Sequence, residues 1–236
     1  MQHLFYPSSE RGTKDIGWLQ SNFSFSFSSY QNPVRKNFGL LHTFNDDLVK
    51  PGGGFGLHPH MNMEIISIML QGKMNHKDTM GYSEIVEKDW VQIMSAGTGL
   101  RHEEHNVGEE DVRFLQIWIE PKLENINPRY QKRFFPKEKR KNILATIVSN
   151  AEGTEHCWIN QNASISLGWF ETGSRFSHNS KGLNSCVYIF VLDGKINIAG
   201  QTVAKRDAIG IWDTEYIDVV IEQEAEFVVI EVPINH

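Results

Sequence analysis

Two pairs of side chains with metal-binding chemistry stand out in the middle of the chain. His58 and His60 are separated by one residue, and His102 and Glu104 repeat that spacing further along. Residues two apart on a β-strand point to the same face, so each pair would present two ligand atoms together. Three neutral imidazoles and a carboxylate suit a divalent first-row metal such as Fe, Mn, Ni, Cu or Zn. Such a set leaves coordination positions open for water, substrate or dioxygen, as catalytic sites do.

Each pair follows a glycine-rich stretch that would form a tight turn. PGGGFGL at 51–57 precedes His58, and Gly97 and Gly99 precede His102. Glycine permits sharp turns and close backbone approach, so two antiparallel strands could carry the pairs to the mouth of a small barrel. A single His-x-His on a strand is usually incidental, but two ligand pairs behind such turns favour a metal site.

The remaining elements predict a protein built from strands. Short segments rich in β-branched and aromatic residues recur, bounded by Gly, Asn and Asp, which is typical of a β-sandwich or barrel. Residues 22–28 alternate apolar and polar side chains like a half-buried strand, and a single helical turn is expected within 125–135. The expected strands are 22–28, 64–70, 112–119, 142–148, 164–170, 187–192, 195–198, 216–222 and 226–232.

An internal repeat indicates two copies of one barrel unit. Residues 65–89 and 188–207 both run from an apolar strand through Gly-Lys, a short strand, a turn and a further strand to a basic residue before aspartate. Gly72 and Gly194 occupy matching places in the two copies. We expect both in hairpin turns, where glycine tolerates a positive φ.

Composition excludes several classes of protein. The 236 residues carry a net charge of −6, which disfavours direct binding to nucleic acid or an anionic membrane. No run reaches the ~18 apolar residues of a membrane span, and two cysteines cannot form a disulfide framework or a zinc ribbon. A reducing cytoplasm is the expected location.

One basic segment interrupts this acidic chain. Residues 132–141 hold six basic side chains and one acidic side chain. Such a patch could contact phosphate, but no nucleic-acid module accompanies it, so we expect a solvated linker between two domains. The expected domains are 1–135, with the metal, and 136–236.

The spacing of these motifs resembles that of a known superfamily. Gly52, His58, His60 and Glu64 resemble the first cupin motif, and 99–106 resembles the end of the second. The chain more specifically resembles the pirin family, densely over 10–136 and more loosely beyond. There, 158–161 and Gly168 fit the shorter bacterial members that include pirin-like quercetinases. The matching segments are ERG at 10–12, GWLQS at 17–21, FSFSSY at 25–30, FGLL at 38–41, NDD at 45–47, GFGLHPHMNMEIISIMLQG at 54–72, HKDTMG at 76–81, QIMSAGTGLRHEEHN at 92–106 and LQIWI at 115–119.

This resemblance implies an all-β bicupin of two tandem cupin (jelly-roll) β-barrels. The N-terminal barrel would hold the metal through four ligands, and the C-terminal barrel would hold none. Iron(II) is the metal that the family usually carries, although a recombinant sample could hold Zn, Ni, Cu, Mn or Co. His178 is then expected at the surface. The implied ligands are His58, His60, His102 and Glu104.

The choice of carboxylate leaves two alternatives open. Cupins in general use the glutamate of the first motif, here Glu64, whereas pirins use that of the second, here Glu104. Glu64 has the parity to share the face of His58 and His60, so it is kept as a reserve ligand or a neighbour of the ligands. A shift in strand register would exchange Glu104 for Glu103.

Several neighbours could orient the ligands or line the pocket. A metal-bound histidine usually donates its second N–H to a carboxylate or carbonyl, and Glu64, Asp78 and Gln92 are candidates near such groups. His76 could face the pocket, although a hairpin histidine is more often solvated. Phe55 and nearby methionines would suit a flat aromatic substrate if they are not simply barrel core. His105 has the opposite parity to Glu104 and is expected outside the site.

The resemblance implies a dioxygenase that opens quercetin-like flavonols with O2, with Glu104 as the catalytic base. A small aromatic substrate and dioxygen would then be its partners. The alternative is an iron-dependent, redox-sensing protein partner of a transcription factor or metabolic enzyme. A third reading is an isomerase or a dioxygenase for another substrate, since the cupin fold hosts many chemistries.

Overall fold

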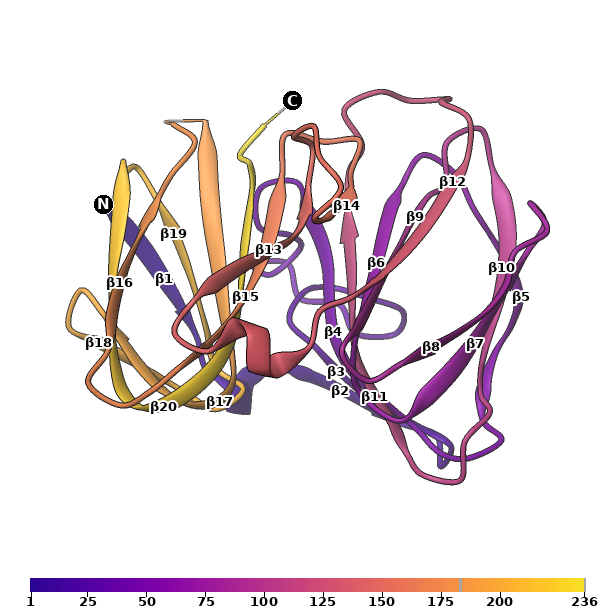
Figure 1. The fold of residues 1–236 in the computed structure, drawn as a ribbon, viewed down its shortest axis with the longest axis horizontal. Coiled ribbons are helices and arrows are strands. Elements are labelled where there is room, and N and C mark those ends of the chain that lie inside the picture. Colours follow the sequence, from indigo (N-terminus) through magenta and orange to yellow (C-terminus); the bar gives the residue numbers. More distant parts are fainter. Residues whose placement is uncertain (183, 236) are drawn as a thin grey trace.

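The chain forms two β-barrels that stand side by side (Figure 1). The computed structural model describes residues 1–182 and 184–235. Helix among them is limited to two short 3-10 turns, η1 (Ser8–Glu10) and η2 (Lys137–Arg140). None of the helices in these ranges is long or apolar enough to cross a bilayer. The expectation of an all-β protein is confirmed.

The first barrel is built from two sheets. The larger has the strand order β12-β9-β6-β11-β4-β3-β2, and the smaller has the order β5-β10-β7-β8. Their strands are β2 (Gly12–Asp15), β3 (Leu19–Phe23), β4 (Leu41–Val49), β5 (Gly54–His60), β6 (Glu64–Gln71), β7 (Lys73–Asp78), β8 (Ser83–Glu87), β9 (Trp90–Ser95), β10 (Leu100–Asn106), β11 (Val112–Ile119) and β12 (Arg129–Phe134).

The second barrel repeats this arrangement in a single sheet with the order β1-β19-β17-β20-β15-β13-β14. In addition, β16 pairs with β20 and β18 pairs with β17. Its strands are β1 (Gln2–Tyr6), β13 (Leu144–Ser149), β14 (Cys157–Trp158), β15 (Ser164–Phe170), β16 (Arg175–Asn179), β17 (Ser185–Ile198), β18 (Gln201–Ala204), β19 (Ala208–Trp212) and β20 (Tyr216–Pro233).

The N-terminal strand belongs to the second barrel. β1 pairs antiparallel with β19, from Gln2 opposite Trp212 to Tyr6 opposite Ala208, and Figure 1 shows its indigo ribbon beside the yellow strands. In the first barrel, β12 takes the equivalent edge position beside β9. Among the described strands, those before residue 135 pair with one another and those after it pair with one another. The exception is β1, which pairs with β19 of the second barrel.

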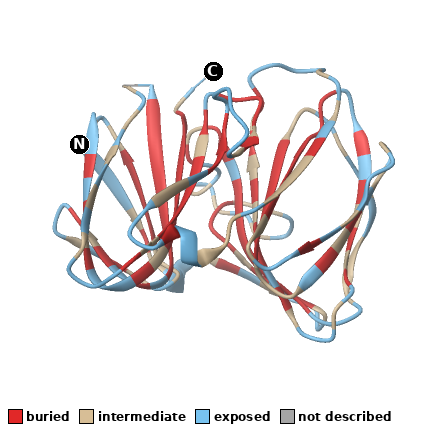
Figure 2. Ribbon diagram, viewed as in Figure 1, coloured by how far each residue is buried: buried red, intermediate tan, exposed pale blue. Residues whose placement is uncertain are grey.

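The two barrels share one apolar core. Alternate side chains of β6 point in opposite directions: Ile66 and Ile68 join the large shared cluster, whereas Met69 packs inside the first barrel. Tyr188 and Phe190 on β17 enter the shared cluster from the second barrel. Figure 2 shows this concentration of buried residues between the barrels. A strand buried on both faces is nearly continuous in apolar residues, as β6 is.

The glycines of the internal repeat lie at corners rather than in hairpin turns, so the expected hairpins are wrong. At Gly72 (φ 74°) the chain leaves the larger sheet at β6 and enters the smaller one at β7. Gly194 (φ 82°) lies inside β17, where the register with β20 shifts on both sides of it. Each glycine bends one long strand around a barrel, which needs a positive φ and no side chain.

We expect Gly194→Ala to destabilise the protein by roughly 2–5 kcal/mol, from left-handed backbone strain together with overpacking. A Cβ at Gly194 would lie 1.9 Å from the Glu224 carbonyl oxygen. Gly200 has nearly the same φ, 84°, and nothing within 4 Å of its Cβ position, so Gly200→Ala isolates the strain alone. Urea unfolding measures both. Equal losses in the two variants would show that the close approach to Glu224 contributes nothing.

The strand predictions succeed for strands that are mostly buried. The ranges 64–70, 112–119 and 164–170 are confirmed by β6, β11 and β15. The pairs 187–192 with 195–198, and 216–222 with 226–232, are each one long bent strand, β17 and β20.

Two local predictions are wrong. The strand expected at 22–28 ends at Phe23, because Ser24 and Phe25 are both buried where the barrels meet and Tyr188 Oη donates to Ser24 Oγ at 3.0 Å. The helical turn expected within 125–135 is absent from that range, which instead contains β12.

The basic segment is not a freely solvated linker. Arg140 is 3% exposed and forms ion pairs with Asp89 of the first barrel (3.2 Å) and Glu226 of the second (3.3 Å). Lys137 also pairs with Glu226, at 2.9 Å. Arg140, which was expected to face water, therefore connects the two barrels.

Candidate metal centre

Three histidines meet on two neighbouring strands of the smaller sheet. His58 and His60 lie on β5, and His102 lies opposite His58 on the antiparallel strand β10. The ring centroids are 4.9 Å apart for His58 and His60, 4.4 Å for His58 and His102, and 5.0 Å for His60 and His102. One ring nitrogen from each lies within 4.8 Å of the others. This spacing fits a shared divalent metal.

The histidines are held in the form that binds metals. Burial and the neighbouring imidazoles lower the pKa of His60 to about 4. Burial also lowers the pKa of His102 to about 4, and its effect exceeds the opposing attraction of Glu104; repulsion from His58 and His76 acts in the same direction as burial. Both rings are therefore neutral at pH 7. His58 Nδ1 lies 2.7 Å from the Gly56 carbonyl oxygen, so it carries the proton and leaves Nε2 free as a ligand.

His102 supplies the structural test for a metal. It is 3% exposed, and neither Nδ1 nor Nε2 has a hydrogen-bond partner among the described residues. Leaving a buried polar atom without a partner costs free energy, so two unpartnered nitrogens on His102 indicate a bound ligand. A cation bound between His102, His58 and His60 would bind one of these two nitrogens. The residues present therefore fit a divalent metal.

Glu104 lies on the other side of His102. It is 4% exposed, and its Oε1 accepts a hydrogen bond of 2.5 Å from Gln92 Nε2. Burial alone would raise its pKa, but His76, His102 and Gln92 together lower it, which keeps the carboxylate ionised. Within the described ranges it forms a second metal-compatible group with His76 and His102, rather than with His58 and His60.

A register shift explains this separation. β5 and β10 run in step at His102 opposite His58, but Glu104 lies opposite Phe55, so β5 uses one more residue than β10 over this interval. A bulge of this kind re-aims side chains beside a site. Glu104 still lines the same pocket as His58 and His60.

Gln92 is positioned by its own hydrogen bonds. Tyr130 Oη donates to Gln92 Oε1 at 3.0 Å, and Gln92 Nε2 also approaches Ser67 Oγ at 3.3 Å. With its oxygen accepting from Tyr130, the amide must turn its nitrogen toward Glu104. The structure thus places Gln92 directly behind Glu104, although Tyr130 was not among the residues singled out from the sequence.

His76 is buried rather than solvated, so the expectation for a hairpin histidine is wrong. It is 1% exposed, its Nε2 lies 2.9 Å from Asp78 Oδ2, and its ring stacks on Tyr130 with centroids 4.4 Å apart. Its Nδ1 is 3.9 Å from Glu104 Oε1. Burial opposes protonation, but the Glu104 and Asp78 carboxylates outweigh it and raise the pKa of His76.

Glu64 lies away from the histidines. Its Oε2 accepts hydrogen bonds from Ser95 Oγ (2.8 Å) and from the backbone N–H of Asn160 (3.2 Å). Burial raises its pKa to about 7. Strand parity does not carry over from His60, because the positive φ of 48° at Asn62 and the change of sheet lie between them. Glu64 instead ties the first barrel to a loop after β14.

The pocket beside the histidines has a volume of about 410 Å³ and is rich in aromatic side chains. Phe55 lines it, as expected from the sequence, and packs edge-to-face on Trp18 with centroids 5.5 Å apart. Trp118 also lines it and meets His60 edge-on at 5.1 Å. The volume lies in the range of roughly 300–1,000 Å³ that is usual for small-molecule sites.

Asp47 is a pocket residue that was not assigned a role from the sequence. It is 3% exposed, and its Oδ1 has no hydrogen-bond partner among the described residues. Burial raises its pKa to about 7, and the nearby carboxylates of Asp46 and Glu104 act in the same direction. The signal was two adjacent aspartates inside the otherwise buried strand β4, since a buried carboxyl group usually has a specific purpose.

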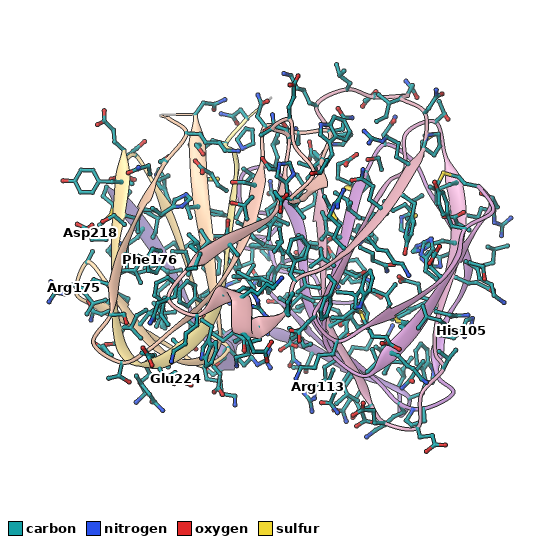
Figure 3. All side chains as sticks on the ribbon, viewed as in Figure 1. His105, Arg113, Arg175, Phe176, Asp218 and Glu224 are labelled. Carbon is teal, nitrogen blue, oxygen red and sulfur yellow. The ribbon has the colours of Figure 1, made fainter. Side chains whose placement is uncertain are left out.

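Other candidates lie outside the cluster. His105 is half-exposed and points toward Glu103, 3.9 Å away, and Figure 3 places it at the outer side of the first barrel. In the second barrel, the partly buried Phe176 stacks on Phe227 with ring centroids 5.4 Å apart. His178, which was expected at the surface rather than among metal ligands, is partly exposed, and its Nε2 lies 3.1 Å from the buried Glu231 carboxylate.

Comparison with known proteins agrees with this geometry. A family model described as Pirin matches residues 5–119, and one described as the quercetinase C-terminal cupin domain matches residues 146–232. The protein named quercetin 2,3-dioxygenase in Escherichia coli strain K12 is 34% identical over 227 residues, covering 96% of each chain.

Solved structures agree over the full length. The crystal structure of YhhW from Escherichia coli is 32% identical and superposes with a TM-score of 0.93 over 100% of both chains. A second structure, described as bacterial pirin YhhW in complex with nickel(II), gives the same TM-score over 98% of this chain and 99% of that chain. The similarity therefore extends over both barrels.

Proposed function

The chain belongs to the pirin family, and from that premise we propose that it is a metal-dependent dioxygenase that opens quercetin-like flavonols with O2. The observation that carries the proposal is the buried, unpartnered His102 beside His58 and His60, at the wall of an aromatic pocket. That arrangement offers a metal and a flat substrate a common site.

We propose His58, His60, His102 and Glu104 as the residues that hold the metal, with iron(II) as its native identity. When bound, a divalent metal supplies Lewis acidity, which lowers the pKa of a substrate hydroxyl group, and a route for exchanging electrons with dioxygen. Zn, Ni, Cu, Mn or Co could occupy the same ligands in a recombinant sample, because the affinity order favours several of them over iron.

Glu104 is the proposed catalytic base. A buried carboxylate that is ionised at pH 7 can take the proton of the flavonol 3-hydroxyl group. Tyr130 and Gln92 hold it from behind, so the carboxylate does not need to reorganise when the substrate arrives. His76 provides a neighbouring group that can share the proton, since it lies between Glu104 and Asp78.

The pocket supports an aromatic substrate. Aromatic rings prefer stacked or edge-to-face contact with other rings, and Trp18, Phe55 and Trp118 present such surfaces around the histidines. A flavonol bound among them would be shielded from water on its flat faces while its hydroxyl and carbonyl groups face the ligands.

Oxygen uptake tests the proposal. The protein is purified anaerobically, stripped with a chelator and reloaded with one metal at a time, and oxygen consumption is recorded after quercetin is added. We expect no uptake without metal, restored uptake after reloading, and the highest rate with iron(II). Full uptake by the metal-free protein would contradict the proposed metal dependence.

Absence of uptake with every metal would favour the alternative, a redox-responsive partner of another protein. Leu57 precedes His58 on β5 and is 49% exposed. Met61 follows the end of β5 directly and is 64% exposed. They would be the apolar contact surface next to the metal.

A further inference from the structure

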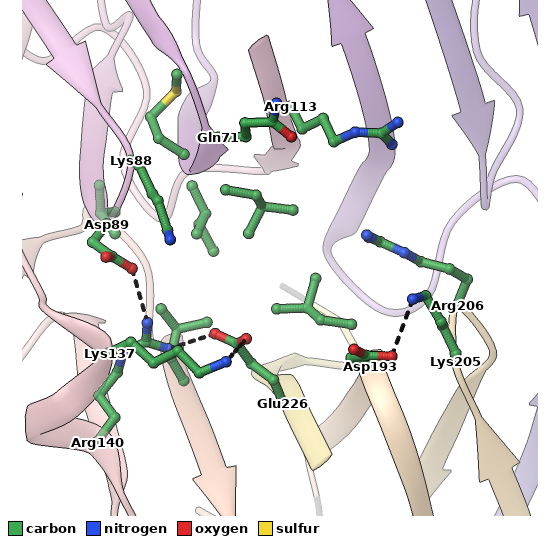
Figure 4. A pocket seen from close by; sticks show the side chains of 16 residues that line it. Gln71, Lys88, Asp89, Arg113, Lys137, Arg140, Asp193, Lys205, Arg206 and Glu226 are labelled. Carbon is green, nitrogen blue, oxygen red and sulfur yellow. Dashed lines mark hydrogen bonds and ion pairs between the residues drawn. The ribbon is translucent and has the colours of Figure 1, made fainter. Parts of the chain in front are cut away.

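A second cavity lies between the two barrels, away from the histidines. It has a volume of about 240 Å³, and its walls come from β6, β11 and the β8–β9 turn on one side and from β17, β20 and the β18–β19 turn on the other. Figure 4 shows it from close by, and Figure 3 places Arg113 at this seam. We call it the inter-barrel cleft.

The cleft is formed by equivalent positions of the two barrels. Gln71 pairs with Arg113 just before the Gly72 corner, and Asp193 pairs with Glu226 just before the Gly194 corner. The two corners therefore face each other across the cleft. Because the packed sheets diverge where their strands bend away, the corners leave a space that the shared apolar core does not fill.

The lining of the cleft is positively charged in an acidic protein. Six cationic and three carboxylate side chains line it, whereas the whole chain has a net charge of −6. The carboxylates already have partners: Asp89 and Glu226 pair with the basic segment, and Asp193 pairs with Lys205 at 3.1 Å. The cationic side chains are Lys88, Arg113, Lys137, Arg140, Lys205 and Arg206.

Two of the cationic side chains have no protein partner among the described residues. Lys88 and Arg113 are exposed at the edge of the cleft, and neither makes an ion pair or side-chain hydrogen bond with a described residue. Arg206 Nη1 lies 3.1 Å from Asp46 Oδ2, yet it is buried without a properly oriented hydrogen bond, and Arg140 Nε is likewise buried without one. In Figure 4 the guanidinium groups of Arg113 and Arg206 lie on the same side of the cleft with open space between them. An anion in that space would be attracted by both positive charges.

We propose that the inter-barrel cleft binds a compact oxyanion carrying at least two negative charges, held by Arg113 and Arg206 with Lys88 at its side. Guanidinium groups bind carboxylate and phosphate oxygens through paired, charge-assisted hydrogen bonds. The volume admits such an anion, since one water molecule takes about 30 Å³ of liquid, but it is smaller than the roughly 300–1,000 Å³ of drug-sized sites. Phosphate and carboxylate groups share this chemistry.

Calorimetric titration of the full-length protein tests the site, with inorganic pyrophosphate and tricarballylate as separate probes. We expect at least one to bind, with an affinity that weakens as sodium chloride is added. The double variant Lys88→Gln/Arg113→Gln should bind it about tenfold more weakly or worse. The matched control is Lys36→Gln/Lys122→Gln, which removes the same charge from exposed positions outside the cleft and should bind as the wild type does.

The metal centre needs its own control, because both probes can chelate metals. His102→Ala should bind the anion as tightly as the wild type does, and melting temperatures confirm that each variant is folded. Failure of both probes to bind, equal binding by the Lys88/Arg113 variant, or loss of binding in His102→Ala would each overturn the proposal.

Discussion

His102→Ala is expected to lower the affinity for the divalent metal by more than about 100-fold, the upper range seen when groups that merely support a ligand are removed. Oxygen uptake with quercetin should disappear with the metal. His102 lies between the two metal-compatible groups, one with His58 and His60 and the other with His76 and Glu104. Its removal therefore disrupts both. Metal content after dialysis, measured by elemental analysis, gives the affinity directly.

Two further variants make this prediction specific. His105→Ala makes the same substitution three residues later, at a half-exposed ring outside the cluster, and should keep both metal and activity. His58→Ala removes a less buried ligand and provides a second measurement if His102→Ala folds poorly. Retention of the metal by both ligand variants would remove the three-histidine site from consideration.

Glu104→Gln is expected to reduce quercetin turnover by about 10²–10⁴-fold, the usual contribution of a positioned general base. The amide keeps the size of the side chain and its acceptor oxygen toward Gln92, so the fold should survive. It cannot accept the substrate proton, and as a neutral ligand it should also hold the metal less firmly. Turnover at saturating metal separates the loss of the base from the loss of the metal.

Glu103→Gln is the matched control. Glu103 is the next residue on β10 and lies nearest to Lys77 and His105, at 3.8 Å and 3.9 Å, away from the pocket. Its substitution should leave turnover unchanged. If Glu103→Gln were inactive and Glu104→Gln active, the register of β10 would be the reverse of that described here, and the base would be misassigned.

Much of the site could be predicted from local pattern, because the side chains of one uninterrupted strand alternate strictly. His58 and His60 share a face for that reason, and so do His102 and Glu104. The inference fails at the first interruption. Glu64 follows a positive φ at Asn62 and a change of sheet, and its carboxylate accordingly reaches Ser95 and Asn160.

The sequence did not identify residues that influence the site from a neighbouring strand. Tyr130 lies on β12, which was expected to contain a helical turn, yet it directs Gln92 toward Glu104 from across the sheet. Asp47 comes into the pocket from β4, and the adjacent aspartates at 46–47 indicate a special role without indicating which pocket they reach. Such contacts depend on which strands pair and in what register, and a single strand carries no record of that.

The sequence by itself determined the two-barrel repeat, the histidine pairs and the positive φ of Gly72 and Gly194, because strand alternation and a positive φ are local properties of the chain. That these glycines lie at barrel corners rather than in hairpins was decided by the pairing of the strands. Only the tertiary structure decided that β1 crosses to the second barrel, that Arg140 is buried between the barrels, and that His76 lies beside Glu104. These depend on packing between segments distant in sequence, where burial and a partner's charge outweigh the preference of an isolated residue for water.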